Sequence, residues 1–175
     1  MSKSVLVSIK PKWCELIASG LKTIEVRKTK PKIETPFKCY IYETKAPRKS
    51  EYYNEFHKKT VGKVVGEFIC DNIDNHSLSE LIVKEDRELA LLSTCLTRDE
   101  ILDYLGYERG TNIYGCKNYD FYGWHISNLK IYDEPKELSE FEIRKDCGGY
   151  FKWHKLSRPP QSWCYVEKLK EREEM

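Results

Sequence analysis

Three ionisable side chains lie close together near the N-terminus, in the sequence GLKTIEVR at positions 20–27. Lys22, Glu25 and Arg27 provide two cations and one carboxylate in this short segment. A lysine and an arginine suit a phosphate group or a carbonyl edge, and a carboxylate accepts hydrogen bonds from a base amine. The combination is therefore a candidate site for a nucleotide or a related polar ring compound.

The alternation of side chains in this segment predicts a strand that carries the charged groups on one face. Ile24 and Val26 alternate with Glu25 and Arg27, so the two pairs point to opposite sides. We expect the apolar pair to face the core and the charged pair to face away from it, about 7 Å apart, with Lys22 at the preceding turn. An amphipathic strand with a surface charge ladder explains the same pattern without any ligand.

The spacing of these residues resembles the G-x-K-x-x-E-x-R signature of the ASCH family, the activating-signal-cointegrator homology domains related to PUA. Gly20, Lys22, Glu25 and Arg27 occupy its four fixed positions. Five further segments resemble the family in the same order along the chain: SIKP at 8–11, YET at 42–44, VVGEF at 64–68, WHI at 124–126 and PPQSW at 159–163. The likeness extends from residue 5 to about residue 167 and so covers most of the chain.

The resemblance implies a mainly β fold with peripheral helices (α+β), a PUA-like six-stranded pseudobarrel with helical insertions. It also implies a cleft between the first helix and the barrel, with binding of RNA or a modified nucleotide as the default activity. The ligand-binding residues implied by family position are Lys10, Lys22, Glu25, Arg27, Tyr42, Thr44, Trp124, Gln161 and Ser162. Tyr42 and Trp124 are the rings expected to stack on a base, which contributes about 1–3 kcal/mol.

Two other functions remain open at the level of the sequence. Some relatives are enzymes, either amidohydrolases that act on acetylated cytidine or ribonucleases. In such a hydrolase Lys22 would be the catalytic base or nucleophile, with Glu25 orienting it. The amidohydrolases carry a threonine where this chain has Glu25, which counts against acetylcytidine hydrolysis. A protein-interaction domain is the third possibility, with the segments 45–60 and 74–118 as its surface.

Periodicity along the chain predicts one domain, residues 1–168, followed by a charged tail at 169–175. The expected strands are 5–9, 23–28, 37–42, 61–73, 114–132 and 161–167. The expected helices are 11–19, 80–92 and 97–105. Thr97 and Glu100 have the spacing of a capping box at the start of the last helix. Residues 136–160 are expected to form a long connection.

Composition and charge indicate one globular chain that stays in the cytoplasm. The 175 residues are 40% hydrophobic, and no segment has the uninterrupted apolar length of a membrane span. Seven widely spaced cysteines, an odd count with no C-x-x-C pair, suit free thiols in a reducing compartment. We therefore expect no metal, no cofactor and no membrane partner. A net charge of +2 is too small to indicate nucleic acid by itself, and nothing in the sequence decides the oligomeric state.

Overall fold

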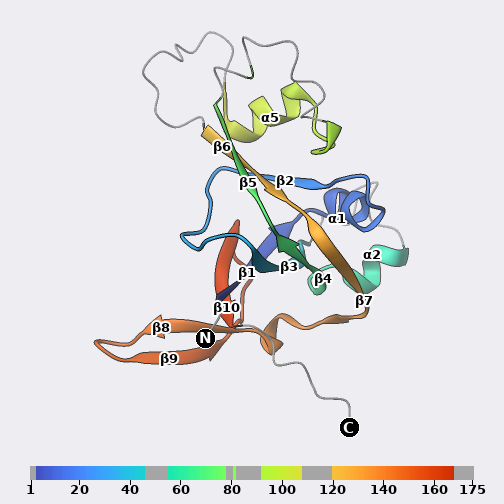
Figure 1. The fold of residues 1–175 in the computed structure, drawn as a ribbon. Coiled ribbons are helices and arrows are strands. Elements are labelled where there is room, and N and C mark those ends of the chain that lie inside the picture. The colour runs from blue at the N-terminus through green and yellow to red at the C-terminus, as the bar shows by residue number, and fades with distance from the viewer. Residues whose placement is uncertain (1–2, 46–54, 78–80, 82–91, 108–119, 168–175) are drawn as a thin grey trace.

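The computed structural model describes residues 3–45, 55–77, 81, 92–107 and 120–167 (Figure 1). The strands in this part of the chain are β1 (Lys3–Ile9), β2 (Ile24–Arg27), β3 (Phe37–Glu43), β4 (Val64–Cys70), β5 (Ile73–Ser77), β6 (Asp120–His125), β7 (Ser127–Lys136), β8 (Glu142–Asp146), β9 (Phe151–Lys155) and β10 (Trp163–Glu167). The helices are α1 (Pro11–Ala18), α2 (Glu55–Thr60), α5 (Arg98–Leu105) and the 3₁₀ helix η2 (Leu138–Glu140). Most of the helix expected at 80–92, and the charged tail, lie outside the described residues.

Two sheets carry the fold, and the chain passes from one sheet to the other four times, at β1–β2, β2–β3, β4–β5 and β6–β7. The larger sheet has the order β10-β1-β3-β4-β7 and the smaller sheet has the order β2-β6-β5. β1 and β3 are parallel, with α1 and β2 between them in the sequence, whereas the other paired strands are antiparallel. β4 leads directly into β5 and β6 leads directly into β7, so both connections cross between the sheets (Figure 1).

The expected mainly β architecture with peripheral helices is confirmed, but the sheets remain open. Hydrogen bonds between the described strands do not close the two sheets into a barrel. The strand expected at 61–73 is instead two strands, because the chain leaves the larger sheet after Cys70 and enters the smaller one at Ile73. Gly66 is required within β4, since a Cβ atom there would lie 2.6 Å from the Lys130 carbonyl oxygen of β7. The pairing register of these two strands shifts at the same place.

Apolar side chains fill both sides of the larger sheet. The main core cluster, between the sheets, consists of Val5, Val7, Ile9, Cys14, Ile17, Phe37, Cys39, Ile41, Val65, Phe68, Cys70 and Trp124. The outer cluster, on the opposite face, consists of Leu6, Tyr40, Tyr42, Val64, Phe141, Leu156 and Val166. β1 is therefore buried on both faces, which explains why its sequence is a run of apolar residues rather than an alternation.

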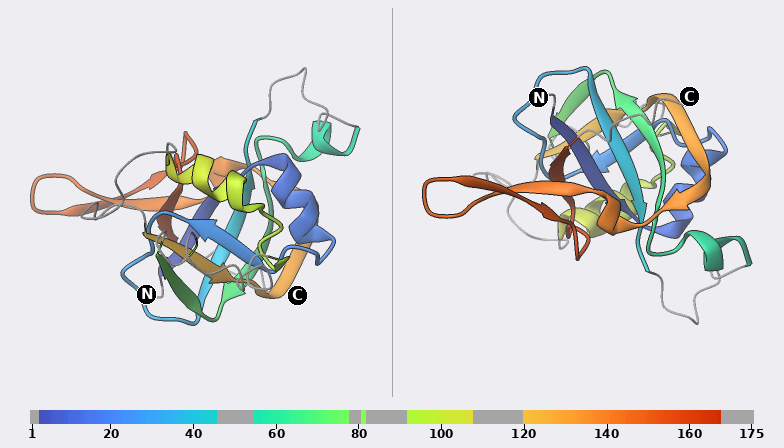
Figure 2. Two further views of the ribbon diagram at one scale, coloured as in Figure 1. Left: turned by 90° about the horizontal axis from the view of Figure 1, so that it is seen from above. Right: turned by 90° about the horizontal axis from the view of Figure 1, so that it is seen from below.

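Residues 136–160 form η2 and a β-hairpin, so the prediction of a long connection is wrong. β8 and β9 pair around a turn in which Gly148 and Gly149 both have positive φ. The root of the hairpin is fixed because Phe141 and Leu156 are buried in the outer cluster, where the Leu156 N–H donates to the Phe141 carbonyl at 2.8 Å. Figure 2 shows the hairpin projecting away from the two sheets. Most of its side chains are exposed on both faces, so the apolar alternation typical of a strand is absent.

We expect Phe141→Ala to lower the free energy of unfolding by about 3–5 kcal/mol, because it empties a fully buried position at the root of the hairpin. Phe151→Ala is the matched control, since it removes the same side chain from an exposed position on β9 and should cost within about 0.5 kcal/mol. Urea unfolding followed by circular dichroism measures both values. Equal losses in the two variants would show that Phe141 does not anchor this region.

Candidate functional site

Strand β2 is short, and both of its faces are buried. On one face, Val26 packs with Phe121 of β6 and with Ile101 of α5. On the other face, Glu25 lies beside Trp124, its partner in the β2–β6 ladder, and points toward the main core. The prediction that Val26 faces the main core and Glu25 faces away from it is therefore wrong. Helix α5 supplies a second apolar cover, so the apolar residues of β2 have partners on the outer face of the smaller sheet.

The structure brings Lys22, Glu25 and Arg27 into direct contact, and we call these three residues the charged cluster. The Glu25 carboxylate lies between the two cations, with Oε1 2.9 Å from Arg27 Nη2 and Oε2 3.4 Å from Lys22 Nζ. Only 1% of Lys22 and 6% each of Glu25 and Arg27 is exposed. Removing ions from water costs several kcal/mol each unless they are paired and hydrogen-bonded. The further contacts of the two cations are therefore essential to the arrangement.

Lys22 follows the turn that ends α1, and its side chain has three acceptors. Its Nζ donates to the carbonyl oxygens of Ile24 at 2.8 Å and of Thr94 at 2.5 Å, in addition to its contact with Glu25. The ring of Trp13 lies 5.3 Å from Nζ, within the range of a cation–π interaction. An ammonium group carries three N–H bonds, so each of them has an acceptor in this arrangement.

Arg27 connects β2 to the larger sheet. Its Nη2 donates to the Ser8 carbonyl at 2.6 Å, and its Nη1 lies 3.4 Å from Ser162 Oγ. Ser8 in turn donates through its N–H to the Ser162 carbonyl at 2.9 Å and through its hydroxyl to the Pro160 carbonyl at 2.6 Å. The Nε of Arg27 is buried and has no hydrogen-bond partner among the described residues. The guanidinium group therefore retains one donor that these contacts do not use.

Three other predicted site residues lie around the C-terminal end of β1, next to the contacts of Arg27. Thr44 is partly buried, and its N–H donates to the Ile9 carbonyl at 2.8 Å. Lys10 directly follows β1, is exposed and precedes the first residue of α1. Gln161 is exposed and directly precedes the serine that contacts Arg27. The fold thus gathers the predicted polar residues from segments far apart in the sequence.

The two aromatic residues predicted to stack on a base are both buried. Tyr42 is 3% exposed and lies in the outer cluster, on the face of β3 that points away from the main core. Trp124 is fully buried in the main core, where the rings of Phe37 and Trp163 each lie 6.0 Å from it. The indole N–H of Trp124 has no partner among the described residues. Neither ring is open to a base in this structure.

Two partly exposed rings near the charged cluster escaped the sequence analysis as ligand candidates. Trp13 of α1 covers Lys22, and Tyr104 of α5 lies close enough for the cluster to affect its pKa. Burial raises the pKa of Tyr104, and the Glu25 carboxylate adds to the rise while Arg27 opposes it. The spacing of Trp13, Leu16 and Ile17 is that of an apolar helix stripe, so the sequence alone indicates packing for Trp13. Tyr104 carries no signal in the sequence, because its position follows from the packing of α5 on the smaller sheet.

A second buried acid, Glu43 at the end of β3, lies near the charged cluster. Its carboxylate Oε1 is 2.6 Å from His57 Nδ1, and both side chains are almost completely buried. Burial raises the pKa of Glu43, although hydrogen bonds with Thr60 and His57 act in the opposite direction. The pKa of the neighbouring Cys14 thiol is raised well above its usual value by burial and then by the carboxylates of Glu43 and Glu25. Cys14 is therefore a protonated thiol at neutral pH, and not a nucleophile.

A cavity of about 250 Å³ lies on the outer face of the smaller sheet, and its lining includes Ile24 and Thr94, whose carbonyl groups accept from Lys22. Its lining is mainly apolar and includes Ile24, Val26, Leu81 and Phe121. Among the residues that the structure describes, no three acidic, histidine or cysteine side chains converge where they could hold a metal ion. None of the described helices is long and apolar enough to cross a membrane.

Comparison with known proteins identifies the fold and then the family. The two-sheet arrangement is PUA-like and is similar to the crystal structure of ASCH from Zymomonas mobilis, with a TM-score of 0.57 and 18% identity over 94% of this chain and 88% of that one. A serine-to-alanine variant of that protein has a TM-score of 0.58, and a tyrosine-to-phenylalanine variant has 0.54. Both variants are 19% identical to this protein over 94% of its chain. The match covers 89% of the serine-to-alanine chain and 91% of the tyrosine-to-phenylalanine chain. The ASCH domain model matches residues 7–108. This chain therefore belongs to the ASCH domain family. No curated protein sequence matches it significantly.

We expect Glu25→Gln to lower the free energy of unfolding by about 3–5 kcal/mol, because two buried cations lose the charge between them. Lys12→Gln is the matched control. It breaks the partly exposed pair with Glu100, at 3.0 Å, and should cost no more than about 1 kcal/mol. Denaturant unfolding at neutral pH compares the two variants. If Glu25→Gln lowered the free energy of unfolding by as little as the control does, the structural role assigned to this carboxylate would be contradicted.

Proposed function

We propose that this protein binds RNA or a modified nucleotide at the end of β1, with the charged cluster beneath the bound ligand. The observation that carries the proposal is the buried contact of Lys22, Glu25 and Arg27. Two cations and one carboxylate leave the cluster with one net positive charge, in a site that is largely shielded from water. Such a site favours a phosphate group or an electron-rich carbonyl over bulk solvent.

The residues around the cluster supply the other contacts that a nucleotide needs. Lys10 is exposed beside the carbonyl groups that hold Arg27 and is suited to a phosphate. Thr44, Gln161 and Ser162 offer hydroxyl and amide groups for a sugar or a base edge. Trp13 takes the stacking role that was predicted for Tyr42 and Trp124, because Trp13 is partly exposed and they are buried. These assignments follow from position, and the family's general RNA-binding character supports them.

The arrangement of Lys22 favours binding over hydrolysis. A general base or nucleophile needs a lone pair directed at the substrate. All the N–H positions of the Lys22 ammonium group instead have acceptors, namely Ile24, Thr94 and Glu25. In this arrangement Lys22 orders the backbone and balances the carboxylate. Binding is therefore the activity that the geometry supports best, and we propose no reaction.

The binding proposal is tested by Lys10→Ala, which changes an exposed side chain and leaves the core intact. We expect weaker binding of a single-stranded RNA, because one phosphate contact is lost. The slope of log affinity against log salt concentration should also decrease in magnitude by about 1. Lys130→Ala, on the exposed side of β7, is the matched control and should leave affinity and slope unchanged. Fluorescence anisotropy titrations at several salt concentrations measure both. Identical slopes for the two variants would exclude Lys10 from the site.

Binding and hydrolysis are separated by incubating the protein with RNA and with acylated nucleosides and analysing the products by mass spectrometry. We expect no turnover, because Lys22 has no free lone pair in the arrangement described above. The comparison variant is Lys22→Gln, in which the buried ammonium group is removed. Turnover by the unmodified protein that disappears in Lys22→Gln would overturn the binding assignment in favour of a hydrolase.

A further inference from the structure

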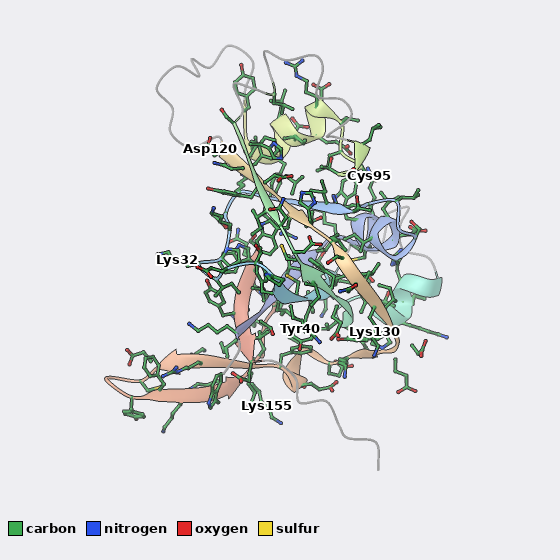
Figure 3. The ribbon with its side chains drawn as sticks, in the orientation of Figure 1. Lys32, Tyr40, Cys95, Asp120, Lys130 and Lys155 are labelled. Carbon is green, nitrogen blue, oxygen red and sulfur yellow. The ribbon has the colours of Figure 1, made fainter. Side chains whose placement is uncertain are left out.

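The β8–β9 hairpin is an isolated two-stranded ribbon that is fixed at one end only. Phe141 and Leu156 hold its root in the outer cluster, and the rest projects away from the sheets (Figure 2). Lys155 lies near the root (Figure 3), where Ile143 also packs against the outer cluster, and the other side chains of the two strands are exposed. An isolated two-stranded ribbon of this kind has only marginal stability in water. The packing of the root explains how this one is held, but it does not explain why the outer part extends so far.

The outer part of the hairpin carries three large exposed rings. Tyr150, Phe151 and Trp153 are 55%, 57% and 43% exposed, and all three lie within four residues of each other. Single exposed apolar residues are common on protein surfaces, whereas several together mark an interaction surface. Among the described residues, only cationic side chains of the hairpin itself lie over these rings, namely Arg144 over Phe151 and Lys152 over Tyr150. They therefore require an explanation other than packing.

Basic side chains alternate with these rings. Between residues 142 and 155 the hairpin has four cations and two carboxylates, a net charge of +2 that equals the net charge of the whole chain. The cations are Arg144, Lys145, Lys152 and Lys155. All four are exposed. The surface that they form together with the rings is complementary to a polyanion with planar groups.

One face of the ribbon shows how rings and cations are organised. Trp153 lies directly opposite Arg144 in the antiparallel register, and Phe151 is two residues from Trp153 on the same strand, so the three side chains share a face. The guanidinium carbon of Arg144 lies 3.7 Å from the centre of the Phe151 ring. Arg144 thus already lies against an aromatic ring, and arginine also stacks on bases.

We propose that the β8–β9 hairpin is a second binding surface, specific for single-stranded nucleic acid. Bases stack on Trp153 and Phe151, and Arg144 and the neighbouring lysines hold the phosphates. A single strand fits better than a duplex, because only unpaired bases expose their faces to rings. The proposal does not depend on the function proposed above for the charged cluster, since the two sites share no residue. Their failures are therefore distinguishable.

The test measures binding of a fluorescein-labelled oligonucleotide of about 12 nucleotides, as RNA and as DNA, to the full chain by fluorescence anisotropy. We expect Trp153→Ala and Phe151→Ala each to weaken binding by roughly tenfold, and Trp153→Phe to restore most of the loss because it keeps a ring. Ile131→Ala, which removes a partly exposed apolar side chain from β7, is the matched control and should have no effect. Circular dichroism confirms that each variant is folded.

Three results would overturn the proposal. The first is unchanged affinity in the Trp153→Ala and Phe151→Ala variants. If Lys10→Ala weakens binding in that case, the nucleic acid is held at the charged cluster and not at the hairpin. The second is tighter binding of a duplex than of either strand. The third is the absence of binding to both RNA and DNA, which would indicate that the rings contact another protein. A loss of affinity confined to the hairpin variants supports the proposal even if Lys10→Ala is neutral.

Discussion

The contact of Glu25 with two cations is the interaction on which the arrangement of the candidate site depends. Through Lys22 the carboxylate is linked to the turn after α1 and to the backbone at Thr94. Through Arg27 it is linked to β1 and to the segment that leads into β10. One buried acid therefore links four separate segments of the chain through the two cations that it contacts. Charges in such a position are costly to bury, and their mutual contact offsets that cost only while all three remain in place.

The family and the main elements were predictable because their signals are local. The spacing of Lys22, Glu25 and Arg27 identified the family, and β1 and β3 follow from runs of β-branched and aromatic residues. The capping box of Thr97 and Glu100 begins α5 as predicted, since both reciprocal hydrogen bonds depend on residues only three apart. These are features in which a few neighbouring residues decide the structure.

Features that depend on distant contacts were mispredicted or missed. The direction in which β2 faces depends on α5, which covers Val26 from the outside, and no pattern within β2 contains that information. Thr94 holds Lys22 through a carbonyl group, which every residue possesses, so its side chain gives no signal. The hairpin escaped prediction because solvent covers both of its faces, and strands are recognised mainly from the contrast between a buried and an exposed face.

The position of β1 between β3 and β10 has a consequence for how the chain is made. One edge of this apolar strand pairs with β3, which follows it closely in the sequence, whereas the other edge pairs with residues 163–167, which are synthesised much later. Until residues 163–167 have been synthesised, the N–H and C=O groups on the second edge of β1 lack these strand partners. Exposed strand edges recruit other chains, and pairings between remote segments form slowly. The nascent chain is therefore vulnerable to aggregation until β10 becomes available to pair with β1.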